Sequence, residues 1–361
     1  MDGLRALSVI AVALSHWTMY WHPKTTAFSR AAELGVETFF VISGFLITGI
    51  LLDNRSEEQS SLVLKNFYCR RFLRIFPLFY LVLVIALLLD SKGLRQSWEW
   101  HFGYLSNLYF YLHGWTGQLN HFWSLAVEEQ FYLVWPLLIL RVSMRSLPFV
   151  LISCIFSAPI YAVYMSMFHP GANGSGAGIL MPSCLGALGL GAFLAYAIRT
   201  RRAMPWITRQ LFLAGLTGTV LWHTVGSPEQ FAPLNRLAED LLLGWLVFGV
   251  AQGFRGPAGW LLSWSPIAYL GKISYGLYVI HNFARPLLGG ALKGLHCPEG
   301  VAKLCQERAA VAIFLYTAIT VGLASFSWYF WEKPLNDLKR HFPYPPKTQP
   351  RPTLAPGENK G

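Results

Sequence analysis

The sequence predicts an all-α fold, a polytopic transmembrane helix bundle of about ten spans. Of the 361 residues, 54% are hydrophobic and only 13% are charged, whereas soluble domains average about 45–50% and about 25%. Apolar runs of about twenty residues recur along the chain, and each is long enough to cross a hydrocarbon core of about 30 Å as a helix. The expected spans are residues 4–21, 35–52, 75–90, 123–140, 147–165, 177–198, 208–225, 237–254, 264–283 and 309–331.

An even number of spans places both termini on one side of the membrane. Lys and Arg are concentrated in the segments on that side, so the positive-inside rule predicts cytoplasmic N and C termini. The same rule accounts for the net charge of +11. We therefore expect no nucleic-acid partner, and we expect contact with membrane lipid.

The first span, residues 4–21, holds two groups that are costly in hydrocarbon, Arg5 and His16. At about 100° and 1.5 Å per residue, their spacing brings both side chains to one helix face, about 16 Å apart along the axis. His16 is the candidate general base, because neutral imidazole can take a proton from a hydroxyl near pH 7. The alternative is a structural hydrogen bond from His16 to a helix carbonyl. The segment lacks a small-residue cleavage site, so we do not expect a signal peptide.

The second span begins with GVETFFVISGFLIT, residues 35–48, in which Glu37 and Ser43 are candidates for lining a site. The stretch LKNFYCRRFLRIFPLFY, residues 64–80, then places Lys65, Arg70, Arg71 and Arg74 just before the third span. Arg71 and Arg74, at i and i+3, can face one anion, and guanidinium suits phosphate through its paired donors. The alternative is that these residues are ordinary topology signals.

The fourth span begins with HFWSLAVEEQFYLVW, residues 121–135, in which Glu128 and Glu129 lie inside the apolar run and Trp123 is a further site-lining candidate. Ser124, Glu128 and Tyr132 follow i, i+4 and i+8 and would form one polar stripe. Glu128 could fix the tautomer of His16 and stabilise its imidazolium. The alternative is that Glu128 pairs with a His or Arg only to hold the bundle together.

Two later stretches carry further candidates. Residues 171–196 are rich in glycine but lack GxxxxGK[ST], so we interpret the glycines as close helix packing rather than a phosphate loop. The stretch GKISYGLYVIHN, residues 271–282, adds Ser274, Tyr275 and His281 near the external edge. His281 could contact an acceptor or anchor its helix.

The remaining segments concern the cysteines, the absence of metal motifs and the end of the domain. Cys297 and Cys305 fall in a predicted external loop, and whether they form a disulfide stays open. The sequence contains neither CxxC nor HExxH, so we expect no metal and no tightly bound cofactor. Residues 1–340 form the expected membrane domain, and the proline-rich residues 341–361 an expected disordered cytoplasmic tail.

The ordered set of motifs resembles membrane acyltransferase family 3, multi-span enzymes that O-acylate surface glycans and some secreted small molecules. The resemblance covers nearly the whole chain. It is carried by DGLRALSVIAVALSH, GVETFFVISGFLIT, RRFLRIFP, HFWSLAVEEQFYLVWP, ISYGLYVIHN and WEKPL.

The resemblance implies a cytoplasmic acyl-CoA donor, usually acetyl-CoA, and transfer to a hydroxyl of a glycan or other acceptor at the outer face of a bacterial inner membrane. It carries the essential pair onto Arg5 and His16, the Arg-x-x-Arg motif onto Arg71 and Arg74, and the acidic block onto Glu128 and Glu129. The acceptor, the acyl length, the oligomeric state and the choice between direct transfer and an acyl-histidine intermediate stay open.

The sequence departs from the family pattern in three places. The chain begins almost on the opening signature, and whether Met1 is the true start stays open. Many relatives carry Arg-x-Asp where this sequence has Cys184 and Gly186. No extramembrane domain follows the last span, which matches the form without a fused SGNH domain, and a separate periplasmic partner stays open. The alternative from another class is a transporter or flippase for a lipid-linked or small anionic substrate, although we find no internal repeat of the kind common in transporters.

Overall fold

The computed structural model describes residues 1–19, 21, 26–56, 58–89, 94–169, 171, 176–200, 205–226, 231–254, 256–294 and 308–345, and all regular secondary structure in these ranges is helical. The expected all-α fold class is therefore confirmed. The longer helices are α1 (Asp2–Thr18), α2 (Thr26–Asp53), α3 (Ser60–Leu88), α6 (Phe122–Arg141), α7 (Leu147–Phe168), α8 (Met181–Arg199), α9 (Pro205–Val225), α10 (Ala232–Ala251) and α16 (Ala309–Ser327). The shorter ones are α4 (Trp98–Phe102), α5 (Ser106–His113), η2 (Ala177–Ile179), α11 (Gly256–Ser263), α12 (Ser265–Lys272), α13 (Ser274–Ile280), η4 (His281–Phe283), α14 (Ala284–Gly294), a π turn (Trp328–Glu332), α17 (Lys333–Asp337) and η6 (Leu338–His341).

Several of these helices are long and apolar enough to cross a membrane. In the described ranges there are five, or up to six if the bent pair α10 and α11 is one span. Helices suit this environment because each satisfies its own backbone hydrogen bonds without water. The expected count of ten spans and the cytoplasmic termini stay predictions.

Two expected spans differ from the structure. Residues 264–283 are not one helix but α12, α13 and η4 in succession. Gly271, at the end of α12, packs so closely on the backbone of Asp2 that a Cβ atom there would overlap it. The third expected span, 75–90, is the second half of α3, so the basic residues from Lys65 to Arg74 lie in the first half of the same helix.

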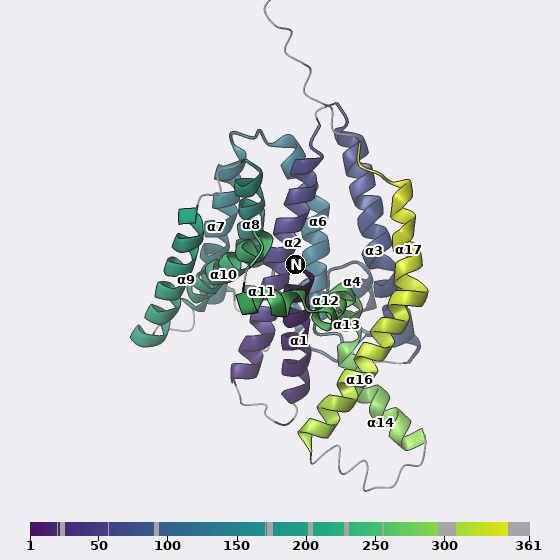
Figure 1. The fold of residues 1–361 in the computed structure, drawn as a ribbon. Coiled ribbons are helices and arrows are strands. Elements are labelled where there is room, and N and C mark those ends of the chain that lie inside the picture. The colour runs from purple at the N-terminus through teal and green to yellow at the C-terminus, as the bar shows by residue number, and fades with distance from the viewer. Residues whose placement is uncertain are drawn as a thin grey trace, which may run out of the picture.

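Helix α2 runs through the centre of the bundle (Figure 1). Helices α7, α8, α9 and α10 gather on one side of it, and α3, α16 and α17 lie on the other. Glycines let α2 and α8 meet backbone to backbone: a Cβ atom on Gly44 would overlap Leu188, and one on Gly191 would overlap Val41. The packing interpretation of the glycine-rich stretch is thus confirmed for Gly191.

Helix α1 begins partway along the bundle. It has 17 residues and α2 has 28, so at 1.5 Å per residue they are about 26 Å and 42 Å long. The end of α1 and the start of α2 lie at the same end of the bundle (Figure 1). The start of α1, with Arg5 in its first turn, therefore lies well short of the opposite end, where α2 meets α3.

The last described residues pack on α3. The side-chain amide of Asn66 donates to the carbonyl of Pro343 at 2.5 Å, and Arg70 donates to the carbonyl of Phe342 at 3.2 Å. Phe342 and Pro343 of the expected tail thus contact α3, and residues 346–361 lie outside the described part of the chain. Cys297 and Cys305 also lie outside it.

The contact between α2 and α8 generates a stability prediction. Gly191→Ala should destabilise the folded protein by about 2 kcal/mol, because the new methyl group would force the two backbones apart. Gly322→Ala in α16 is the matched control, since a Cβ atom there meets nothing within 4 Å. Thermal unfolding of the purified variants in detergent measures the difference, and equal melting temperatures would contradict the packing argument.

Candidate active site

A cavity lies between α1, α2, α3, α6 and α13, and the polar side chains that line it come from all five helices. Three are arginines and two are glutamates. The polar lining is Arg5, Ser43, Arg71, Arg74, Ser124, Glu128, Glu129, Tyr132, Ser274, Tyr275 and Tyr278. The structure thus brings together ten of the sixteen candidate residues that the sequence indicated.

The three guanidinium groups of the cavity have positive charges that no ion pair in the described part of the chain neutralises. The side chains of Arg5, Arg71 and Arg74 form no hydrogen bond or ion pair within the described ranges. Arg71 instead lies over the rings of Phe67 and Tyr132, with its central carbon 5.7 and 5.4 Å from the ring centroids. Partly buried cations without counter-ions are unfavourable. The cavity is therefore suited to an anionic ligand.

The predicted polar stripe of α6 forms one wall of this cavity. The Ser43 hydroxyl donates to Glu128 Oε1 at 2.6 Å, and the Tyr132 hydroxyl donates to Ser43 Oγ at 3.1 Å. Glu129 Oε1 is buried and has no hydrogen-bond partner in the described part of the chain. The stripe is thus ordered by α2, which supplies Ser43, as well as by its own helix.

Three histidines form a cluster beyond the cavity. His16 Nδ1 lies 2.8 Å from His281 Nε2, and the two rings stack with centroids 5.1 Å apart. The ring of His121 lies 4.6 Å from that of His281. His121 and His281 are buried, with 2% and 0% of their surface exposed. His16 comes from α1, His281 from η4 and His121 from the turn before α6, so segments distant in the sequence bring the three rings together.

The hydrogen bonds assign the tautomers of the His16–His281 pair. His281 Nδ1 lies 2.6 Å from the carbonyl of Tyr278, so it carries the hydrogen and donates. His281 Nε2 is then an acceptor, and His16 Nδ1–H donates to it. This leaves the lone pair on His16 Nε2, which is the nitrogen available to take a proton.

Shared helices connect the histidine cluster to the cavity. Helix α1 carries Arg5 and His16, and α13 carries Tyr275 and leads directly into His281. His121 immediately precedes α6. The Tyr278 hydroxyl lies 2.5 Å from Ser124 Oγ and donates to the carbonyl of His121 at 3.1 Å. Movement of a cavity helix would therefore be transmitted to the imidazoles.

Four candidates lie outside the cavity lining and the histidine cluster. Lys65 is exposed, and Arg70 donates to the carbonyls of Lys339 and Phe342. Trp123 packs edge to face against Phe40, at a centroid distance of 6.0 Å. Glu37 pairs with Arg236 Nε at 2.5 Å.

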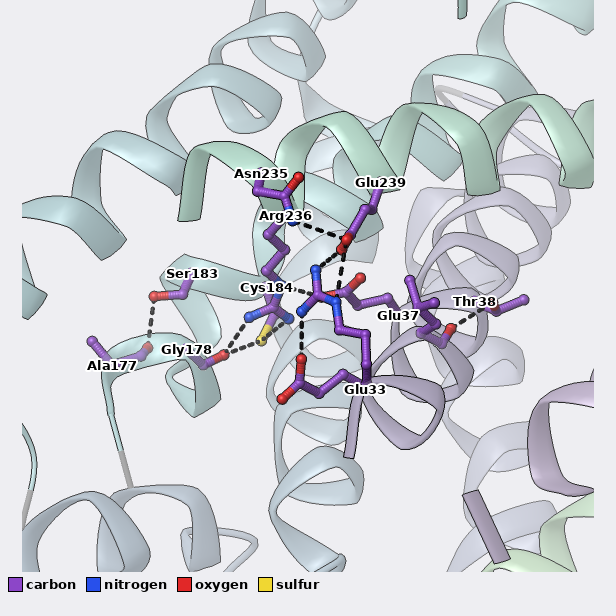
Figure 2. A network of polar contacts seen from close by, with 12 residues as sticks. Glu33, Glu37, Thr38, Ala177, Gly178, Ser183, Cys184, Asn235, Arg236 and Glu239 are labelled. Atoms are coloured by element: carbon purple, nitrogen blue, oxygen red, sulfur yellow. Dashed lines mark hydrogen bonds and ion pairs between the residues drawn. The ribbon is translucent and has the colours of Figure 1, made fainter. Parts of the chain in front are cut away.

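Glu37 belongs to a buried ionic network that joins α2, α8 and α10 (Figure 2). Arg236 bonds to the carbonyl of Gly178 at 2.9 Å, and Arg30 pairs with Glu239. Asn235 also donates to Glu239, at 2.9 Å. The pairing of Glu37 with Arg236 gives Glu37 a structural environment here.

The same network fills the place where the sequence departs from Arg-x-Asp. Arg236 Nη2 lies 3.9 Å from Cys184 Sγ, and a Cβ atom on Gly186 would lie 3.3 Å from Asp240 Oδ2. An arginine and an aspartate of α10 thus lie beside the two positions of α8 that lack them. The small residues at 184 and 186 leave the space for them.

Sequence reasoning did not single out His121, Asn282 or Tyr278. His121 Nδ1 accepts from the Asn282 amide at 2.9 Å, which fixes its ring. The position of His121 could have indicated its role, because His121 begins the stretch of residues 121–135 that contains Glu128. In the described ranges, no three or more His, Cys, Asp or Glu side chains are grouped to hold a metal ion.

Proteins of similar sequence indicate the family to which this site belongs. The sequence profile of the acyltransferase-domain family, acyltransferase 3, matches residues 1–332. The peptidoglycan O-acetyltransferase OatA of Listeria monocytogenes is 30% identical over 362 aligned residues, which cover 93% of this chain and 55% of that protein. The putative peptidoglycan O-acetyltransferase YrhL of Bacillus subtilis is 27% identical and covers 93% of this chain and 54% of its own.

A third relative is the O-acetyltransferase OatA of Staphylococcus aureus, 27% identical over 78% of this chain and 49% of its own. The chain spans about half the length of these relatives. No solved structure matches it significantly. The extent of the profile match, together with the cationic cavity and the motifs that line it, shows that the chain belongs to the acyltransferase 3 family.

Proposed function

We propose that the protein is an integral membrane O-acetyltransferase of a bacterial inner membrane, with both termini in the cytoplasm. It moves an acetyl group from cytoplasmic acetyl-CoA to a hydroxyl of a cell-wall glycan at the outer face. Two of the relatives are named as acting on peptidoglycan, which favours a carbohydrate acceptor. The family membership and the apolar helices support the reaction class and the membrane location.

The donor enters the cationic cavity in this proposal. Arg5, Arg71 and Arg74 are the groups there without partners in the described chain, and a phosphorylated thioester supplies the negative charge that they lack. The pantetheine arm extends along α1 toward His16, about 16 Å from Arg5 along the helix axis. Glu128 and Glu129 offset part of the cationic charge.

His16 is the general base. Its Nε2 takes the proton of the acceptor hydroxyl as the oxygen attacks the thioester carbonyl. The tetrahedral intermediate collapses with cleavage of the carbon–sulfur bond, and the imidazolium proton passes to the departing CoA sulfur. Acetyl ester and free CoA are the products, and His16 returns to its neutral form.

The observation that carries this assignment is the hydrogen bond from His16 Nδ1 to His281 Nε2, 2.8 Å long. It leaves Nε2 free to act as the base, and it favours the imidazolium because the donating N–H becomes a stronger donor when the ring is charged. The sequence suggested Glu128 for this support. The partner that His16 contacts is His281, whereas Glu128 contacts Ser43.

Replacing the base should remove turnover. We expect His16→Ala to lower the rate of CoA release from acetyl-CoA about 10²- to 10⁴-fold, measured with protein in lipid nanodiscs and crude cell-envelope extract as the source of acceptor. His113→Gln is the matched control, because His113 is exposed and lies outside the cavity and the histidine cluster. A transporter would release no CoA, so an inactive wild-type protein would favour that alternative.

Replacing a cavity arginine should weaken donor binding. Arg71→Gln should raise the KM for acetyl-CoA about tenfold to a hundredfold, because one charge-assisted contact to the donor is lost. Arg145→Gln tests the loss of an exposed arginine outside the cavity. An unchanged KM in Arg71→Gln, with folding verified by size-exclusion chromatography, would remove this residue from the donor site.

Replacing the partner of His16 should slow the chemical step. His281→Leu should lower kcat about tenfold to a hundredfold with little change in KM, because it removes the acceptor that orients His16. His281→Gln should recover part of the loss, since its amide oxygen can accept the same hydrogen bond. Equal kcat in the two variants would mean that His281 acts only through packing.

A further inference from the structure

A second cavity adjoins the first and shares three of its lining residues, Arg5, Arg74 and Tyr275. The residues that only the second cavity has come from the start of α1, the end of α12, the π turn and α17. They include Asp2, Lys272, Trp328 and Glu332. Because the shared residues form the wall between the cavities, a long ligand that passes Arg5 and Arg74 would occupy both.

The cations of the second cavity lack protein partners. Arg5, Arg74 and Lys272 form no ion pair within the described ranges. The Lys272 ammonium lies over the Trp328 ring, 5.3 Å from its centroid. Two carboxylates also face this cavity, Asp2 and Glu332, and Glu332 accepts from the Ser327 hydroxyl at 2.9 Å. Three cations thus outnumber two carboxylates.

An unused donor points to the same kind of ligand. Trp328 Nε1 is buried and has no hydrogen-bond partner in the described chain. A buried N–H without an acceptor is costly. Together with the surrounding cations it indicates a ligand that carries anionic oxygen atoms, such as phosphate.

The backbone that presents Trp328 is unusual. Residues Trp328–Glu332 form a π turn between α16 and α17. Such turns are rare and frequently occur at functional sites. Here the π turn packs closely on α13: a Cβ atom on Gly276 would lie 3.1 Å from Glu332 Oε1.

We propose that the second cavity binds the phosphate groups of the thioester donor, with Lys272, Arg74 and the Trp328 N–H as their partners. This inference rests on the proposed function and refines it. The pantetheine arm then passes Arg5 and enters the first cavity, where Arg71 donates to its amide oxygens. Lys65 and Arg70, which the sequence suggested for the phosphates, are respectively exposed and bonded to backbone carbonyls. The phosphate of an anionic phospholipid has the same chemistry, and the test must distinguish it from the donor.

The experiment compares two donors that differ in their phosphates. The KM and kcat for acetyl-CoA and for S-acetylpantetheine, which has no phosphate, are measured in nanodiscs for wild type, Lys272→Gln and Trp328→Phe, together with the Kd for CoA. Trp328→Phe keeps an aromatic ring under Lys272 and removes only the N–H. Lys333→Gln is the matched control, because Lys333 is exposed, lies 3.9 Å from Asp337 and is not in the cavity lining.

We expect Lys272→Gln to raise the KM for acetyl-CoA and the Kd for CoA about tenfold to a hundredfold, and Trp328→Phe to raise them a few-fold. Neither variant should change kcat or the KM for S-acetylpantetheine, and Lys333→Gln should behave as wild type. Equal effects on both donors, or no effect on acetyl-CoA, would overturn the inference. A Lys272→Gln effect that disappears when phosphatidylcholine replaces anionic lipid would assign the cavity to a phospholipid and also overturn it.

The same measurements separate this inference from the proposed function. If wild-type protein neither binds CoA nor cleaves acetyl-CoA, both are wrong. If wild type binds and cleaves the donor and Lys272→Gln is indistinguishable from it, only the phosphate assignment is wrong.

Discussion

The site depends on the placement of guanidinium groups inside an apolar bundle without protein counter-ions. Arg5, Arg71 and Arg74 come from α1 and α3, and in the described part of the chain they have carboxylates in the same cavity lining, and Arg71 two aromatic rings, but no ion pairs. Such an arrangement costs free energy in the empty protein. A ligand that supplies the missing charge recovers this free energy, so affinity for an anion and reduced stability of the unliganded bundle have one cause.

Three helices connect the cationic cavity with the histidine cluster. Each of α1, α6 and α13 carries cavity residues, and His16, His121 and His281 lie within or directly beside them. The distance between Arg5 of the cavity and His16 of the cluster is therefore set by the length of one rigid helix, α1. On the other side of α2, the Glu37–Arg236 pair and the glycine contacts of α8 fix the position of the central helix. The ion pairs and the glycines thus stabilise the frame around the cavity.

Much of this arrangement could be predicted from the sequence. Apolar runs gave the all-α class, and helical periodicity predicted the Ser124–Glu128–Tyr132 stripe that lines the cavity. The broken segment 264–283 could not be predicted, because its apolar composition fits a continuous helix and the break accompanies a close contact of Gly271 with Asp2. The partners of Glu37 and His16 were equally hidden, since Arg236 and His281 are distant in sequence. His121 begins the stretch that contains Glu128, but its neighbours Phe122 and Trp123 suggest an aromatic group at a membrane interface rather than a site residue.

The π turn at Trp328–Glu332 also determines how the following C-terminal segment is rotated about its helix axis. A π turn accommodates one residue more than the α-helical repeat, and each residue corresponds to about 100° of rotation. The phase it imposes decides which carbonyls of the C-terminal segment face α3, where Arg70 binds those of Lys339 and Phe342. Chain length at this turn is therefore constrained as well as side-chain identity. Losing a single residue would rotate the C-terminal segment relative to α3 and separate its carbonyls from Arg70, even though Arg70 itself is unchanged.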